Sequence, residues 1–264
     1  GIPKMDNSDG IKELVQAQFA GSAQQFVESK LHRQGDDLQR MVDLAELSGH
    51  ERVLDIATGG GHTALAFARH VREVVATDLT PKMLAVAEEY VTAQGQKNVQ
   101  FMRADAEALP FSNAEFDVVT ARLAPHHFPN PRRFVSEVAR VLLPGGRFIL
   151  DDNMGPEDDE LFDFMDRFER WRDPSHVRAL RLSEWRSICE DNRLRVIHTD
   201  PLTKKVYPYK EWTERMRLPP MQTDALAAFI LASPEHVKEF FDVQVVDGKL
   251  QSLCATFGIL VAVT

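Results

Sequence analysis

The stretch Val53-Leu54-Asp55-Ile56-Ala57-Thr58-Gly59-Gly60-Gly61-His62-Thr63-Ala64 decides the fold of this chain. Its first half is a short apolar run interrupted only by Asp55, and its second half is a run of glycines that leads into a helix-like segment. This order predicts a buried strand, a tight turn and a helix. Glycine permits positive φ and lets a ligand approach the main chain closely. The free N–H groups at the start of the helix suit a polar or anionic group, so the stretch predicts a nucleotide-like ligand.

The glycine spacing does not by itself identify that ligand. Gly59, Gly61 and Ala64 also satisfy the looser dinucleotide pattern, and Asp78 follows at about the offset of an acid that binds a ribose hydroxyl. An NAD-dependent oxidoreductase is therefore one interpretation. Asp55 favours another, because a carboxylate before the glycines suits a cationic amine, held directly or through water, and would repel a pyrophosphate.

The stretch resembles motif I of the class I S-adenosylmethionine-dependent methyltransferases, whose pattern is (D/E)-x-x-x-G-x-G, at Asp55 to Gly61. Further segments follow in the order of that family: VVATDLTPKMLAVA with Asp78, FMRADAEALPF with Asp105, FDVVTARLAPHHF, and VLLPGGRFIL. The series covers roughly residues 34–152. It is most similar to the branch that includes the ubiquinone and menaquinone biosynthesis methyltransferases and related small-molecule methyltransferases.

The resemblance implies an α/β fold: a Rossmann-like, doubly wound, seven-stranded and mostly parallel sheet with an antiparallel last strand, N-terminal helices and a helical insertion before the last strand. We expect a single methyltransferase domain over residues 1–264. Within it, residues 36–152 form the cofactor-binding core, and residues 153–264 form a substrate-side half with the insertion at about 207–250. Residues 1–35 are expected either to close over the site as a lid, lined by Phe19, Phe26 and His32, or to pack as a helix pair.

Apolar periodicity places the other elements. Helices are predicted over residues 36–47, 62–70, 81–95, 131–143, 161–171, 183–192, 223–231 and 234–241, with Ser183 as an N-cap. Strands are predicted over residues 73–78, 98–104, 116–120, 147–150, 193–201 and 255–263.

The resemblance implies that S-adenosyl-L-methionine is the cofactor and S-adenosyl-L-homocysteine the product. Asp78 would accept hydrogen bonds from the ribose hydroxyls, Asp105 would accept one from the adenine amino group, and Leu79 and Met83 would pack on the adenine. The alternative is that Asp78 and Asp105 only cap the segments that follow them. The full set of expected cofactor-binding residues is Asp55, Ala57, Thr58, Gly59, Gly61, Asp78, Leu79, Met83, Asp105, Ala106 and Arg122.

Residues near the transferred methyl group are expected in 121–128, because ligands of open α/β sheets bind beyond the carboxyl ends of the strands. His126, and after it His127, are candidate general bases, since imidazole titrates near neutral pH. The alternative is that one ring bonds backbone and the other packs under Phe128. Arg122 is the third candidate catalytic residue: it either holds an anionic or enolate oxygen or anchors the loop.

The reaction implied by the resemblance is direct displacement by a nucleophile of the acceptor. A base is needed only when that nucleophile carries a proton. Carbon, oxygen and nitrogen acceptors all remain open, with a quinone-like or aromatic small molecule favoured by the resemblance and by apolar residues of the insertion that would form a roof over the substrate. These are Trp212, Met216, Met221, Phe229, Phe240 and Phe241.

Composition narrows the classes of partner. A net charge of −9 and a pI near 5.5 disfavour nucleic acid as the substrate. The two cysteines, Cys189 and Cys254, have no metal-binding spacing, so we expect no metal. No apolar run has the length of a membrane span and the first residues lack a signal-peptide core, so we expect a cytoplasmic protein, with its oligomeric state open. A non-catalytic protein that only binds the cofactor is a further alternative.

Overall fold

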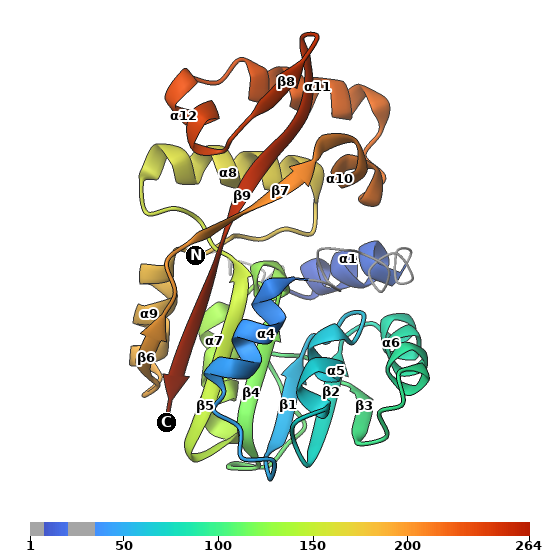
Figure 1. Cartoon of the computed structure of the whole chain (residues 1–264), viewed down its shortest axis with the longest axis vertical. Coiled ribbons are helices and arrows are strands. Elements are labelled where there is room, and N and C mark those ends of the chain that lie inside the picture. The colour runs from blue at the N-terminus through green and yellow to red at the C-terminus, as the bar shows by residue number, and fades with distance from the viewer. Residues whose placement is uncertain (1–7, 21–34) are drawn as a thin grey trace, which may run out of the picture.

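The computed structural model describes residues 8–20 and 35–264 and has a mixed β-sheet at its centre (Figure 1). The order along the sheet is β3-β2-β1-β4-β5-β9-β6; β1 to β5 are parallel, and β9 runs antiparallel to both β5 and β6. This is the predicted doubly wound sheet with an antiparallel last strand. The strands are β1 (Arg52–Ile56), β2 (Glu73–Asp78), β3 (Val99–Arg103), β4 (Phe116–Arg122), β5 (Leu142–Asn153), β6 (Arg195–Thr199), β7 (Thr203–Pro208), β8 (Gln244–Val246) and β9 (Lys249–Val263).

The helices connect these strands and cover the sheet. They are α1 (Ser8–Ala20), α4 (Asp36–Leu44), α5 (His62–Ala68), α6 (Pro81–Ala93), the 3-10 turn η1 (Pro125–His127), α7 (Pro131–Val141), α8 (Asp159–Arg172), α9 (Leu182–Asp191), α10 (Tyr209–Arg215), α11 (Pro220–Leu231) and α12 (Glu235–Phe240). None of those within residues 8–20 and 35–264 has both the length and the apolar character that a membrane crossing requires.

Apolar side chains fill both faces of the sheet because its strands are nearly continuous hydrophobic runs. Val53 and Val74 pack with α4 and α5 on one face, whereas Leu54 and Val75, one residue further along, pack with α7 and α9 on the other. Trp185 of α9 is fully buried in the second of these layers. The sheet is therefore a rigid platform that fixes the positions of the loops at its carboxyl edge.

The insertion forms a second apolar cluster above the sheet (Figure 1). The long strand β9 joins the two parts: its last residues pair with β5 and β6, and its first residues pair with β7 and β8. β7 and β8 extend the sheet beyond the seven predicted strands. The predicted apolar roof is only partly present, because Met221 is 84% exposed and Phe229, Phe240 and Phe241 pack within the second cluster.

One other local prediction was wrong. Ser183 is not an N-cap: α9 begins at Leu182 after Arg181, and Ser183 instead donates from N and Oγ to Glu157. The segment after β5 supplies this partner, which is 26 positions away in the sequence. At the end of β5, Asp151 and Asp152 are at most 1% exposed.

In the N-terminal segment, α1 accounts for the first part of the predicted helix pair. Phe26 and His32, proposed as lid residues, lie outside the described residues.

Candidate active site

The glycine turn after β1 has the geometry that its sequence predicts. Gly59 and Gly61 have φ of +55° and +86°, values that favour glycine. A Cβ on Gly61 would lie 3.0 Å from Val91 Cγ2, so this glycine also lets α5 pack against α6. Gly61 serves the packing of the turn, while Gly59 and Gly60 line the cavity beside it.

Asp55 lies beneath the turn and is not one of the residues that line that cavity. It is 1% exposed, and its two carboxylate oxygens accept hydrogen bonds from the Thr58 and Thr120 hydroxyls at 2.7 and 2.8 Å. Burial raises the pKa of Asp55 to about 6. In this structure Asp55 positions the turn through Thr58.

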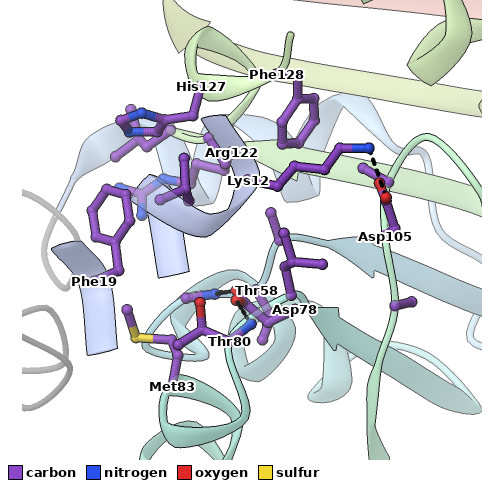
Figure 2. A pocket seen from close by; sticks show the side chains of 18 of the residues that line it. Lys12, Phe19, Thr58, Asp78, Thr80, Met83, Asp105, Arg122, His127 and Phe128 are labelled. Atoms are coloured by element: carbon purple, nitrogen blue, oxygen red, sulfur yellow. Dashed lines mark hydrogen bonds and ion pairs between the residues drawn. The ribbon is translucent and has the colours of Figure 1, made fainter. Parts of the chain in front are cut away.

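Asp78 ends β2 directly opposite the turn (Figure 2). Its carboxylate accepts hydrogen bonds from the backbone N–H groups of Gly59 and Thr80, both at 3.0 Å, and burial raises its pKa. The bond from Thr80 closes a local turn before α6, and α6 has no side-chain cap, so Asp78 does not cap this helix. Asp78 lines the cavity, and a carboxylate oxygen has lone pairs left for hydroxyl donors.

We call the cavity at this edge the strand-end cavity. It is lined by α1, the glycine turn and the loops after β2, β3 and β4, and Figure 2 shows their side chains converging on it. Of the predicted site residues, those on its wall are Ala57, Thr58, Gly59, Asp78, Leu79, Met83, Asp105, Ala106, Arg122 and His127. Asp55, Gly61 and His126 lie behind or beside it. Most of the expected cofactor residues are therefore brought together.

Lys12 of α1 is a site residue that the sequence analysis missed. It reaches across the cavity to Asp105, with 2.8 Å between Nζ and Oδ2, and lies 3.5 Å from Glu107 (Figure 2). Asp105 also accepts a hydrogen bond from the Glu107 N–H, as the capping alternative predicted. Val15 and Phe19 follow on the same side of α1 and line the cavity too. Nothing in the spacing of Lys12 sets it apart from other lysines, so only the fold reveals this contact.

Of the two roles left open for Arg122, the structure shows the anchoring one. Its guanidinium is held by Asp37 at 2.7 Å and lies 3.7 Å from Asp151, yet its side chain still forms part of the cavity wall. Burial raises the pKa of Asp151 well above its usual value, and the adjacent Asp37 carboxylate raises it further. Burial opposes ionisation of Asp37 as well, but hydrogen bonds from Asp151 and Arg122 lower its pKa. Arg122 thus joins α4 to β4 at the edge of the site.

The two histidines have different environments. His126 lies 2.7 Å through Nδ1 from Asp152 Oδ1, and its backbone N–H donates to the other oxygen of the same carboxylate. Burial is the largest single influence and lowers the pKa of His126, but the charge and hydrogen bond of Asp152, together with the charges of Glu169 and Asp173, outweigh it and raise the pKa. His127 bonds the Ser175 carbonyl, and burial followed by the charge of His126 lowers its pKa to about 4. His126 is therefore the stronger base of the pair, and His127 fits the alternative of a ring bound to backbone.

A second cavity, the insertion cavity, adjoins the strand-end cavity. Both are lined by Phe19, Leu123 and His127, so these side chains mark the junction. The rest of its wall comes from η1, the end of β5, α8, β7, α10 and β9: His126, Asn153, Glu169, Arg172, Asp173, Tyr207, Trp212, Arg215, Met216 and Phe257.

Known proteins are similar to this chain in sequence and in fold. A family model described as "Methyltransferase domain" matches residues 54–150. The uncharacterized methyltransferase YcgJ of Bacillus subtilis is 44% identical over 176 residues, which cover 67% of this chain and 70% of that protein. The crystal structure of the same B. subtilis protein has a TM-score of 0.82 at 36% identity and covers 86% of this chain and 97% of its own. The demethylmenaquinone methyltransferase of Thermus thermophilus is 41% identical over 121 residues, which cover 44% of this chain and 54% of that protein.

The fold and the glycine-turn site define a Rossmann-like methyltransferase. With these relatives, the chain belongs to the S-adenosylmethionine-dependent methyltransferase family. This membership overrides the NAD-dependent alternative, which rested on the glycine spacing and on the position of Asp78.

The residues present fit the cofactor of that family. Asp78 offers a carboxylate at the end of β2, where hydroxyl groups of a ribose would meet it, and the apolar side chains of Leu79 and Met83 lie on the same wall. In residues 8–20 and 35–264, no cluster of histidine, cysteine and carboxylate side chains has the geometry of a metal site.

Proposed function

We propose that this chain transfers a methyl group from S-adenosylmethionine, held in the strand-end cavity, to a small molecule held in the insertion cavity. The observation that carries the proposal is the shared boundary at Phe19, Leu123 and His127, which puts the two cavities side by side. When bound, the cofactor supplies a methyl group already activated by a positively charged sulfur. The protein then has to align the acceptor with that methyl group and exclude water.

Residues of this chain would hold the cofactor as follows. Asp78 would accept hydrogen bonds from the ribose hydroxyls, Leu79 and Met83 would contact the adenine, and Asp105 would accept from its amino group. Lys12 currently occupies one oxygen of Asp105, so α1 is tied to the adenine end of the cavity. We propose that α1 acts as a lid, since Lys12, Val15 and Phe19 all lie on the wall that the cofactor would contact.

His126 is the proposed proton acceptor when the nucleophile carries a proton. Asp152 orients its ring through Nδ1, which leaves Nε2 as the nitrogen that can accept a proton, and the side chain lines the insertion cavity. Because Asp152 raises the pKa of His126, the neutral, basic form is populated only above that pKa. The proposal therefore predicts that methyl transfer to a protonated nucleophile speeds up as pH rises through the His126 pKa.

Two observations point to different acceptors. Similarity to demethylmenaquinone methyltransferase favours a quinone-like or aromatic molecule. The wall of the insertion cavity instead carries ionisable side chains, among them Glu169, Arg172 and Arg215, and the apolar roof is incomplete. Since charged groups that line a cavity favour a polar ligand, we propose a small acceptor with an aromatic or planar body and at least one polar group.

The test is transfer of label from S-adenosylmethionine labelled in its methyl group to a panel of small carbon, oxygen and nitrogen nucleophiles. The proposal predicts a small labelled product and equal amounts of S-adenosylhomocysteine. His126→Gln should slow this transfer while leaving S-adenosylhomocysteine affinity unchanged. Cofactor binding without label transfer across the panel would contradict the catalytic part and favour a protein that only binds the cofactor.

A further inference from the structure

Arg215, the last residue of α10, is a cation on the wall of the insertion cavity. Among residues 8–20 and 35–264, none makes a hydrogen bond or an ion pair with its guanidinium. The side chain is partly buried, and its pKa is lowered by this burial and then by the charge of Arg172, against the smaller opposing charge of Glu211. A partly buried cation beside a second cation, with no ion pair to the described residues, suits an anionic group that is supplied from outside.

The acidic side chains of the same wall already have partners. Glu169 accepts a hydrogen bond from Asn153 Nδ2 at 3.0 Å and lies 3.7 Å from Arg172. Asp173 accepts hydrogen bonds from the N–H and the hydroxyl of Ser175, at 2.9 and 2.6 Å. A cationic acceptor would have to compete with these contacts. An anionic acceptor would not.

Arg172 also has N–H donors that make no hydrogen bond to the described residues. Its Nε donates to the Trp212 carbonyl at 3.0 Å, and its guanidinium lies 4.8 Å from the centroid of the Trp212 ring. For its terminal nitrogens, the one ionic contact within the described part of the chain is with Glu169 at 3.7 Å. The Trp212 indole N–H is buried without an acceptor among the described residues. Tyr207 and Trp212 stack at 5.1 Å and give the same wall an aromatic surface. N–H donors and aromatic rings therefore lie together on one side of the cavity.

The geometry points to a methyl acceptor that carries an anionic group, a carboxylate or a phosphate, bound by Arg215 with Arg172 beside it and with its planar body against Tyr207 and Trp212. This inference rests on the proposed function, since it assigns the insertion cavity to the acceptor. Planar guanidinium groups bind such oxyanions through paired N–H donors. Arg215 also lines a groove beside α4, together with Asp36 and Glu211. An anion that approached Arg215 through this groove would pass these two carboxylates, which do not line the insertion cavity.

The experiment is calorimetric titration of the full chain, first saturated with S-adenosylhomocysteine, with benzoate, phenyl phosphate and the neutral analogue benzamide. Saturation comes first so that the carboxylate of the cofactor product cannot account for the anion site. We expect benzoate or phenyl phosphate to bind at least tenfold more tightly than benzamide, and the tighter of the two distinguishes a carboxylate from a phosphate site.

Variants of Arg215 test whether this residue binds the anion. Arg215→Met should weaken anion binding about tenfold or more, while Arg215→Lys, which keeps the charge, should restore part of it. Lys210→Met is the matched control, because it removes a positive charge from an exposed position of the same helix and should have no effect. The affinity of each variant for S-adenosylhomocysteine, measured in the loading step, reports whether the fold is intact.

Equal binding of benzoate and benzamide, no binding of either anion, or unchanged anion binding in Arg215→Met would each overturn the inference. If Arg215→Met does not fold, the charged and neutral probes can still be compared on the wild-type chain and on Arg215→Lys. That comparison tests whether Arg215 binds the anion. Failure of the proposed function gives different results: either S-adenosylhomocysteine does not bind in the loading step, or it binds while the labelling test shows no methyl transfer to any acceptor.

Discussion

Replacing Asp78 by alanine tests the strand-end cavity most sharply. The carboxylate would bind the ribose hydroxyls of the cofactor, and hydrogen bonds to a charged group contribute about 1.5–3 kcal/mol. Because each 1.4 kcal/mol corresponds to tenfold in affinity, we expect Asp78→Ala to weaken S-adenosylhomocysteine binding roughly 10- to 150-fold. The variant also loses the hydrogen bonds from Gly59 and Thr80, so its free energy of unfolding should fall by about 1–2 kcal/mol.

The assay is calorimetric titration, paired with urea unfolding to measure stability. Asp117→Ala is the control, because Asp117 accepts a backbone hydrogen bond from Arg52 at 2.8 Å near the amino ends of β1 and β4, away from the cavity. It should lose stability without losing cofactor affinity. Unchanged affinity in a folded Asp78→Ala variant, or an equal loss of affinity in Asp117→Ala, would refute the assignment of Asp78.

The remaining predictions concern the lid, the base and the core. Lys12→Met removes the ion pair with Asp105, so α1 should become more accessible to protease and cofactor affinity should change; identical proteolysis and affinity would argue against a lid. Asp152→Asn removes the charge that raises the His126 pKa, so the pH at which methyl transfer reaches half its maximum should move to lower pH, and an unmoved pH profile would exclude His126 as the base. Trp185→Ala should lower the free energy of unfolding by about 3–5 kcal/mol in urea titration, because the indole is fully buried; a loss below about 1 kcal/mol would contradict the packing.

The sequence predicts the cofactor half of the site because its signals are local. A strand, a glycine turn and a helix occupy adjacent residues, Asp78 is the last residue of β2, and Asp105 is the second residue after β3. In a parallel sheet the carboxyl ends of the strands meet at one edge, so the order of elements alone brings these residues together. The packing of both faces follows from the apolar runs for the same reason.

The rest of the site depends on contacts between residues far apart in the chain. Lys12 meets Asp105 across 93 positions, and Arg122 meets Asp37 across 85. The insertion has no periodic signal that predicts which of its side chains face inward, so Met221 was expected in the roof although it is exposed. Nothing in the sequence pointed to Arg215, since only the folded structure reveals that its guanidinium has no ion-pair partner among the described residues.

The central claim is that the strand-end cavity binds S-adenosylmethionine rather than a dinucleotide. The measurement that tests it most directly is calorimetric titration of the full chain with S-adenosylmethionine and S-adenosylhomocysteine, with NAD as the control. The account predicts saturable binding of both sulfur compounds at micromolar concentrations and none of NAD. Binding of NAD, or no binding of either sulfur compound to the folded chain, would contradict it.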